Sequence, residues 1–122
     1  MEWKLTGDRL IWLQLKEQII QRIVTGTYPM GSRLPTVREL ATEAGVNPNT
    51  MQRALAELEN DGLAESHRTA GRLVTTDAAA LEAVRSGLAE KLMIDFYEGM
   101  EQLGYSHAES RKKLEEGMKH GQ

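Results

Sequence analysis

The polar residues of the stretch 47–61 have the types and the spacing of a surface that reads DNA bases. Placed about 100° apart around a helix axis, the apolar residues of this stretch gather on one side and the polar residues on the other. Amide side chains can bond bidentately to adenine, and arginine to guanine, at the edge of the major groove. The outward side consists of four polar residues and one small residue that permits close approach: Asn49, Gln52, Arg53, Asn60 and Ala56. On an isolated helix such residues are more often plain solvated surface, so the neighbouring elements must decide between the two interpretations.

Two short helices joined by a glycine turn are expected to position this face. Thr36, with a glutamate three residues later, has the spacing of a capping box that begins a first helix, and Gly45 supplies the positive φ that ends it. Asn47, followed by proline, then begins the second helix. The pattern predicts a helix-turn-helix over residues 34–62, preceded by a helix over residues 12–25.

A β-hairpin is predicted directly behind the second helix. Residues 63–66 and 72–76 read as two short strands around a basic tip at residues 67–71. Behind a reader helix such a hairpin is a wing, because a narrow minor groove attracts inserted arginine. The other interpretation is a solvated hairpin whose arginines bind nothing.

One long helix is predicted over residues 78–103, and it carries a continuous apolar stripe. No other element of the chain is large enough to cover that stripe, so we expect it to be buried against a second copy of the chain. A last helix over residues 106–118 begins with a serine-glutamate capping box. The stripe that predicts a homodimer consists of Leu81, Val84, Leu88, Leu92, Phe96 and Leu103.

The composition excludes several classes of function. The chain has 122 residues and no cysteine, which excludes disulfides and thiolate zinc sites, and we expect no metal and no cofactor. The histidines are scattered and no serine lies in a nucleophile motif, so an enzyme is not expected. There is no apolar run of about 20 residues and no leader sequence, so we expect no membrane segment and a cytoplasmic location.

The net charge of −3 at first argues against a nucleic-acid partner. Residues 1–76, however, hold nine basic and nine acidic residues, whereas residues 77–122 hold six basic and nine acidic residues. The excess of acid therefore belongs to the tail, and the first part can still present a basic face.

The N-terminal arm and an acidic cluster at the end of a helix are two further regions with a recognisable residue pattern. In residues 1–11, Trp3 and Leu5 can anchor the arm either on the core of its own chain or on a second subunit. The acidic cluster of Glu57, Glu59 and Asp61 at the end of a helix is interpreted as a solvated face and not as a catalytic carboxylate pair.

Three motifs together resemble a known family. They are residues 34–41 (LPTVRELA), 46–54 (VNPNTMQRA) and 58–63 (LENDGL), and through them residues 11–76 resemble the winged helix-turn-helix domain of the GntR family of bacterial transcription regulators. The resemblance implies a mainly α fold with a small β-hairpin wing. It also implies a DNA-binding domain over residues 1–76 and a helical dimerisation tail over residues 77–122.

The resemblance also implies which residues contact DNA. The reader contacts would be Arg38, Asn47, Asn49, Thr50, Gln52 and Arg53. The wing residues Arg68, Gly71 and Arg72 would lie at the minor groove, although the family's usual threonine-aromatic pair is replaced here by Arg72 and Leu73.

The short tail is similar to that of the YtrA subfamily. This similarity implies a homodimeric repressor that binds a palindromic DNA operator. Any small-molecule effector would bind between the subunits, or between the DNA-binding domain and the tail. The alternative is a winged-helix module for protein or RNA contact, which the negative net charge would suit.

Overall fold

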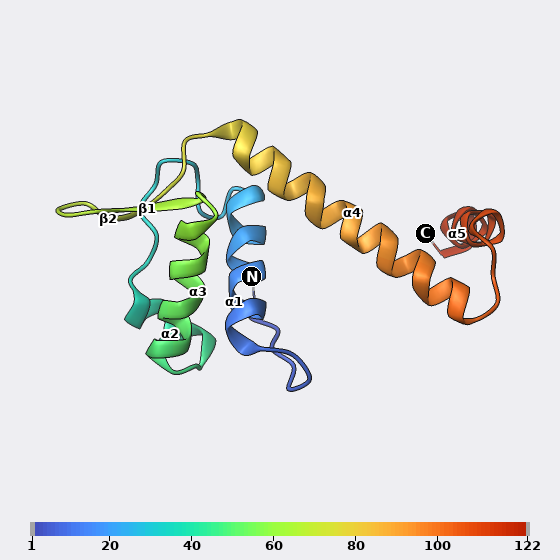
Figure 1. Ribbon diagram of the computed structural model, residues 1–122, viewed down its shortest axis with the longest axis horizontal. Coiled ribbons are helices and arrows are strands. Elements are labelled where there is room, and N and C mark those ends of the chain that lie inside the picture. The colour runs from blue at the N-terminus through green and yellow to red at the C-terminus, as the bar shows by residue number, and fades with distance from the viewer. Residues whose placement is uncertain (1, 122) are drawn as a thin grey trace. The chain divides into compact units, whose positions relative to one another are not determined.

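The computed structural model describes residues 2–121, with side chains through residue 118. It confirms the expected mainly helical fold with a two-stranded wing (Figure 1). The chain divides between residues 83 and 84 into two compact units, which are described separately. The elements are α1 (Ile11–Val24), α2 (Val37–Ala44), α3 (Pro48–Asn60), β1 (Ala64–His67), β2 (Gly71–Val74), α4 (Ala78–Gln102) and α5 (His107–Gly121).

The core of the first unit forms where α1 and α2 pack against α3. Each of the three helices buries the apolar face that its sequence pattern predicts, because these side chains recur at intervals of three and four residues. Leu34, Leu63 and Val74 close the core from the loops and the wing. The buried helical residues include Leu15, Ile19, Ile23, Leu40, Ala41, Met51, Ala54, Leu55 and Leu58.

The helix boundaries around the turn follow local hydrogen bonds. The Thr36 hydroxyl accepts from the Glu39 amide at 3.1 Å, and the Glu39 carboxylate accepts from the Thr36 amide at 3.0 Å, which confirms the capping box. Gly45 ends α2 in the left-handed conformation with a φ of 71°. Asn47 caps α3, with Pro48 as the first helical residue. These contacts set the short turn between α2 and α3.

The wing is an antiparallel hairpin reinforced by a third segment. His67 pairs with Gly71 and Ala64 with Val74, so β1 lies one residue later than predicted, β2 covers 71–74 and not 72–76, and the tip is residues 68–70. On the other side of β2, Arg33 forms a bridge with Leu73. The Leu34 amide donates to the Arg72 carbonyl at 2.8 Å, and the Val74 amide donates to the Ser32 carbonyl at 2.8 Å. The segment before α2 therefore holds the base of the wing.

Within the single chain, the N-terminal arm packs on α1 and α2. The Trp3 ring lies over the guanidinium of Arg22, with Cζ 3.8 Å from the ring centroid, and Trp3 Nε1 donates to Glu43 at 3.2 Å. Arg22 is buried and donates to Tyr28 and to Glu43. Side-chain amides of α1 also bond the arm, including Gln18 to Lys4. The arm thus ties α1 to α2.

The second unit consists of most of α4 and all of α5. The capping box predicted at its second helix is present, because the Ser106 hydroxyl accepts from the Glu109 amide and the Glu109 carboxylate accepts from the Ser106 amide. The Tyr97 and His107 rings stack with centroids 4.5 Å apart, which joins α4 to the start of α5. Among the described residues, no helix is long and apolar enough to cross a bilayer.

Gly45 has a positive φ and Gly87 lies inside a helix, so replacing each with alanine should change stability in opposite directions. We expect Gly45→Ala to destabilise the fold by about 1 kcal/mol, because φ is positive there and a Cβ is strained even without a steric neighbour. Gly87→Ala, in the middle of α4 and also without a neighbour within 4 Å, should stabilise the chain by about 0.5 to 1 kcal/mol. Urea unfolding at one fixed protein concentration measures both changes. Equal effects of the two substitutions would contradict the assigned conformations.

Candidate nucleic-acid interface

The outward face of α3 is the candidate reader surface. Met51, Ala54, Leu55 and Leu58 are completely buried, and this fixes the rotation of the helix about its axis. The side chains on the opposite side are therefore directed to solvent, because residues at 100° steps divide cleanly between the two faces. The exposed residues include Asn49, Gln52, Arg53 and Asn60, whereas Thr50 and Ala56 are half-buried at the edges.

The start of each helix of the turn supplies one of the implied contacts. Arg38 is exposed in the first turn of α2, so it is available to a ligand beside the reader face. Asn47 has a structural task, since its Oδ1 accepts from the Asn49 amide at 2.7 Å and caps α3. Its oxygen is therefore already bonded, and contact with a base by Asn47 stays a prediction.

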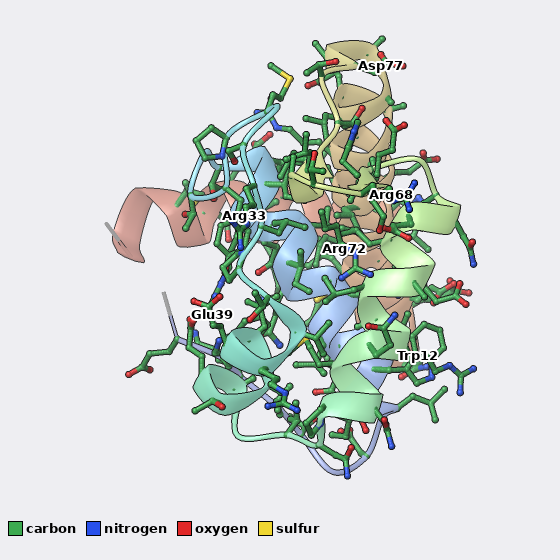
Figure 2. The ribbon with its side chains drawn as sticks, turned by 90° about the vertical axis from the view of Figure 1, so that its left-hand side faces the viewer. Trp12, Arg33, Glu39, Arg68, Arg72 and Asp77 are labelled. Atoms are coloured by element: carbon green, nitrogen blue, oxygen red, sulfur yellow. The ribbon has the colours of Figure 1, made fainter. Side chains whose placement is uncertain are left out.

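Arg53 lies beside α1 through a contact between helices. Its Cζ lies 4.4 Å from the centroid of the Trp12 ring, which is the geometry of a cation–π interaction. Trp12 belongs to the first turn of α1 and is half-buried, and Figure 2 shows it at the edge of α3. The packing of α1 on α3 thus determines where this guanidinium lies.

Arg72 is engaged inside the chain. Its Nε donates to Glu59 Oε1 at 2.9 Å, and the same carboxylate oxygen accepts from the Ser66 hydroxyl. This cluster, which we call the wing clamp (Glu59, Ser66 and Arg72), joins the end of α3 to both strands of the hairpin. Glu59 therefore neutralises the charge of Arg72, and the contact holds the wing against α3. A direct contact of Arg72 with DNA stays a prediction.

The interpretation of the acidic cluster as a solvated face was wrong for Glu59, whereas Asp61 is exposed. Glu59 belongs to the wing clamp, and Asp61 forms an ion pair with Lys16 of α1. Both partners lie far from the cluster in sequence, which is why periodicity did not identify them. These carboxylates stabilise the arrangement of α1, α3 and the wing.

The pKa of the Glu59 carboxyl reflects this environment. Partial burial by itself would raise that pKa, but hydrogen bonds from Ser66 and Arg72, together with the charge of Arg72, hold it below its ordinary value. The charged form is thus favoured in the folded protein, and the wing clamp persists at neutral pH.

Arg33 is a candidate contact residue that the sequence did not identify. It is exposed, and its side chain passes over Gly71, where a Cβ would meet Arg33 Nε at 3.2 Å. Gly71 also has a φ of 80°, so the backbone conformation favours glycine there. In Figure 2, Arg72 lies between Arg33 and Arg68. The only signal in the sequence was a basic residue within a turn-rich segment, which carries no periodicity.

The ion pairs of residues 1–76 involve only some of the arginines of this segment. Four carboxylates of the described residues up to 76 form ion pairs with Arg9, Lys16, Arg22 and Arg72, and Glu65 lies 3.7 Å from His67, a pair that is charged only when the histidine is protonated. Among the described residues, none of the remaining arginines of this unit has a carboxylate within ion-pairing distance. Those arginines come from the segment before α2, from α2, from α3 and from the wing tip, and are Arg33, Arg38, Arg53 and Arg68.

The predicted dimerisation residues have different surroundings within the single chain. Leu81 is buried in the first unit at 8% exposure, so it anchors the start of α4 on its own chain. Val84, Leu88 and Phe96 are half-buried. Other apolar side chains of the second unit are open to solvent, including Leu92, Met93, Ile94, Leu103, Leu114 and Met118.

Comparisons with known proteins agree with this geometry. The sequence model described as "Bacterial regulatory proteins, gntR family" matches residues 12–74. The chain is 31% identical over 119 residues to the uncharacterized HTH-type transcriptional regulator YhcF of Bacillus subtilis, covering 98% of this chain and 95% of that protein. It is 34% identical over 97 residues to the HTH-type transcriptional repressor YtrA of the same organism, covering 75% of each. A solved GntR family transcriptional regulator from Listeria monocytogenes superposes with a TM-score of 0.84 at 35% identity, over 92% of this chain and 98% of that one.

The wing clamp gives a prediction with a defined pH dependence. We expect Glu59→Gln to lower the free energy of unfolding by about 1 kcal/mol at pH 7, because it removes the charge that pairs with Arg72. Since the folded-state pKa lies below the ordinary value of 4.5, this contribution is fully present above pH 4.5 and is lost as the pH falls through the folded-state pKa.

Thermal unfolding between pH 3 and pH 7 measures this difference. Glu57→Gln on the same helix, a residue without an ion pair among the described residues, is the matched control and should show no such pH-dependent loss. A Glu59→Gln effect that does not change with pH would show that the carboxylate charge is not what holds the wing.

Proposed function

The chain belongs to the gntR family of bacterial regulatory proteins and is a DNA-binding transcription regulator, and we propose that it acts as a homodimeric repressor on a palindromic operator. The family consists of helix-turn-helix regulators and not of enzymes. Three quarters of the chain is similar to YtrA, whose name describes a transcriptional repressor.

One observation carries the assignment of the DNA-binding surface. Among the described residues, the four arginines of this unit without a carboxylate at ion-pairing distance lie on α3, on α2, in the segment before α2 and at the wing tip, while Arg9, Arg22 and Arg72 are paired with carboxylates. Arginine fits phosphate and guanine because its donors form a planar fork. We therefore propose that α3 enters the major groove with Asn49 and Gln52 toward the bases, and that Arg68 of the wing tip reaches the minor groove.

The exposed apolar residues of α4 and α5 support the homodimer. A set of large apolar side chains on one unit is unfavourable in water, and burial against a second copy would remove it from solvent. Two reader helices related by a two-fold axis would match half-sites about one turn of DNA apart. Repression then follows from occupancy of a promoter, in the cytoplasm where the chromosome lies. A small-molecule effector would act by changing the spacing between the two readers.

The reader surface is tested by an exposed arginine. We expect Arg38→Ala to weaken binding to the operator by about 1 to 3 kcal/mol, because a charge-assisted contact is lost without any change in the core. Fluorescence anisotropy with a labelled duplex from the promoter of the protein's own gene measures the affinity. Arg111→Ala, exposed on α5, removes the same side chain far along the chain and should leave affinity unchanged. Equal affinity of wild type and Arg38→Ala would contradict the proposed surface.

The dimer is tested by placing a charge in the apolar stripe. We expect Leu88→Asp to yield monomers, because a buried carboxylate without a partner is strongly unfavourable in an interface. Light scattering of the full chain measures the mass in solution. Ser86→Asp introduces the same charge at an exposed position of α4 outside the stripe and should leave the dimer intact. A Leu88→Asp variant that remains dimeric would exclude this stripe as the interface.

A further inference from the structure

The edge of α3 that faces α1 has a contact that the DNA-binding residues identified so far do not explain. Trp12 lies in the first turn of α1, and the guanidinium of Arg53 stacks on its ring at 4.4 Å from Cζ to the centroid. The Trp12 Nε1 atom is buried and has no hydrogen-bond partner among the described residues. The indole is therefore oriented by packing and by the stacked guanidinium, and not by a polar contact of its own.

Stacking leaves the binding capacity of Arg53 intact. The five N–H groups of a guanidinium lie in its plane, so an aromatic ring against its face does not occupy them. Within the described part of the chain, no carboxylate lies at ion-pairing distance from Arg53, and the residue is exposed. Arg53 thus presents an uncompensated charge and free donors, with its side chain already restricted. This differs from Arg72, whose charge is neutralised by Glu59.

The position of the Arg53 guanidinium over the Trp12 ring indicates which DNA groups its N–H donors can reach. A base-reading arginine extends end-on to the N7 and O6 atoms on the floor of the groove. The guanidinium of Arg53 instead lies over the ring of Trp12 on the neighbouring helix, with Cζ 4.4 Å from the ring centroid. The backbone phosphates line the rims of the groove, on either side of an inserted helix. A side chain held at the edge of α3 is therefore placed for a rim phosphate.

We propose that Trp12 is a positioning residue that holds Arg53 against the α1-facing edge of α3, where the guanidinium binds a backbone phosphate and not a base. This inference rests on the proposed function of α3 as a reader of duplex DNA. It divides the polar face of that helix into two parts: Asn49 and Gln52 select the sequence, and Arg53 sets the depth and register of the helix in the groove.

The experiment compares affinity, specificity and salt dependence. Two labelled duplexes are used: one selected by the wild-type chain from a random-sequence library, and one with the same bases shuffled. Fluorescence anisotropy over a series of KCl concentrations is measured for wild type, Arg53→Gln, Trp12→Leu, Trp12→Phe and the double variant Trp12→Leu/Arg53→Gln. Gln52→Ala is the matched control for a base-reading side chain on the same helix.

We expect Arg53→Gln to weaken both duplexes by the same factor, about tenfold, and to reduce the slope of log affinity against log salt by about one. Gln52→Ala should weaken only the selected duplex and leave the slope unchanged. Trp12→Leu should weaken both duplexes about threefold, and Trp12→Phe should restore most of that loss because it retains an aromatic face. The double variant should bind no more weakly than Arg53→Gln alone, because the indole acts through the guanidinium.

Each contrary result has a distinct meaning. If Arg53→Gln weakens only the selected duplex at an unchanged salt slope, Arg53 reads a base and the phosphate assignment is overturned. If the losses from Trp12→Leu and Arg53→Gln add in full, or if Trp12→Phe is as weak as Trp12→Leu, the positioning role is overturned. A random-sequence library from which the wild-type chain selects no duplex refutes the proposed function itself and this inference with it. Wild-type binding with an unaffected Arg53→Gln variant refutes the inference alone.

Discussion

The complete burial of one face of α3 is the constraint on which the rest of the first unit depends. Met51, Ala54, Leu55 and Leu58 are removed from water against α1 and α2, which fixes the helix in rotation as well as in position. The opposite face of α3 must therefore point to solvent. The polar side chains of the reader surface are thus placed by apolar contacts that they do not themselves make, and any change in the core would move them together.

Ion pairs join different elements of the first unit. Glu43 forms an ion pair with the buried Arg22 under the N-terminal arm. Asp61 pairs with Lys16, and Glu59 pairs with Arg72 at the base of the wing. Within the described part of the chain, Arg33, Arg38, Arg53 and Arg68 have no carboxylate at ion-pairing distance, so no direct partner neutralises their charges. The net charge of −3 therefore says little about the DNA-binding face, since affinity depends on the local arrangement of charge and not on the sum.

The two units use apolar residues in opposite ways. In the first unit they are enclosed by neighbouring helices, whereas in α4 and α5 large apolar side chains such as Leu92 and Leu103 remain exposed at 70% and 74%. The same residue types thus stabilise a fold in one place and, under the proposed homodimer, an assembly in the other. Leu81 belongs to the first group although it begins the stripe of the second, because the first turn of α4 lies within the first unit.

The sequence by itself determined the helix-turn-helix, the capping boxes, the left-handed turn at Gly45 and the extent of α4, because these depend on residues within about four positions of one another. Only the tertiary structure decided which side chains meet between elements. Glu59 with Arg72, Asp61 with Lys16, Arg33 with Gly71 and Arg53 with Trp12 are separated along the chain and share no periodic pattern. Their contacts follow from how α1, α3 and the wing pack together. For that reason the polar face of α3 was readable from its residues, while the orientation of its arginine became visible only in the folded chain.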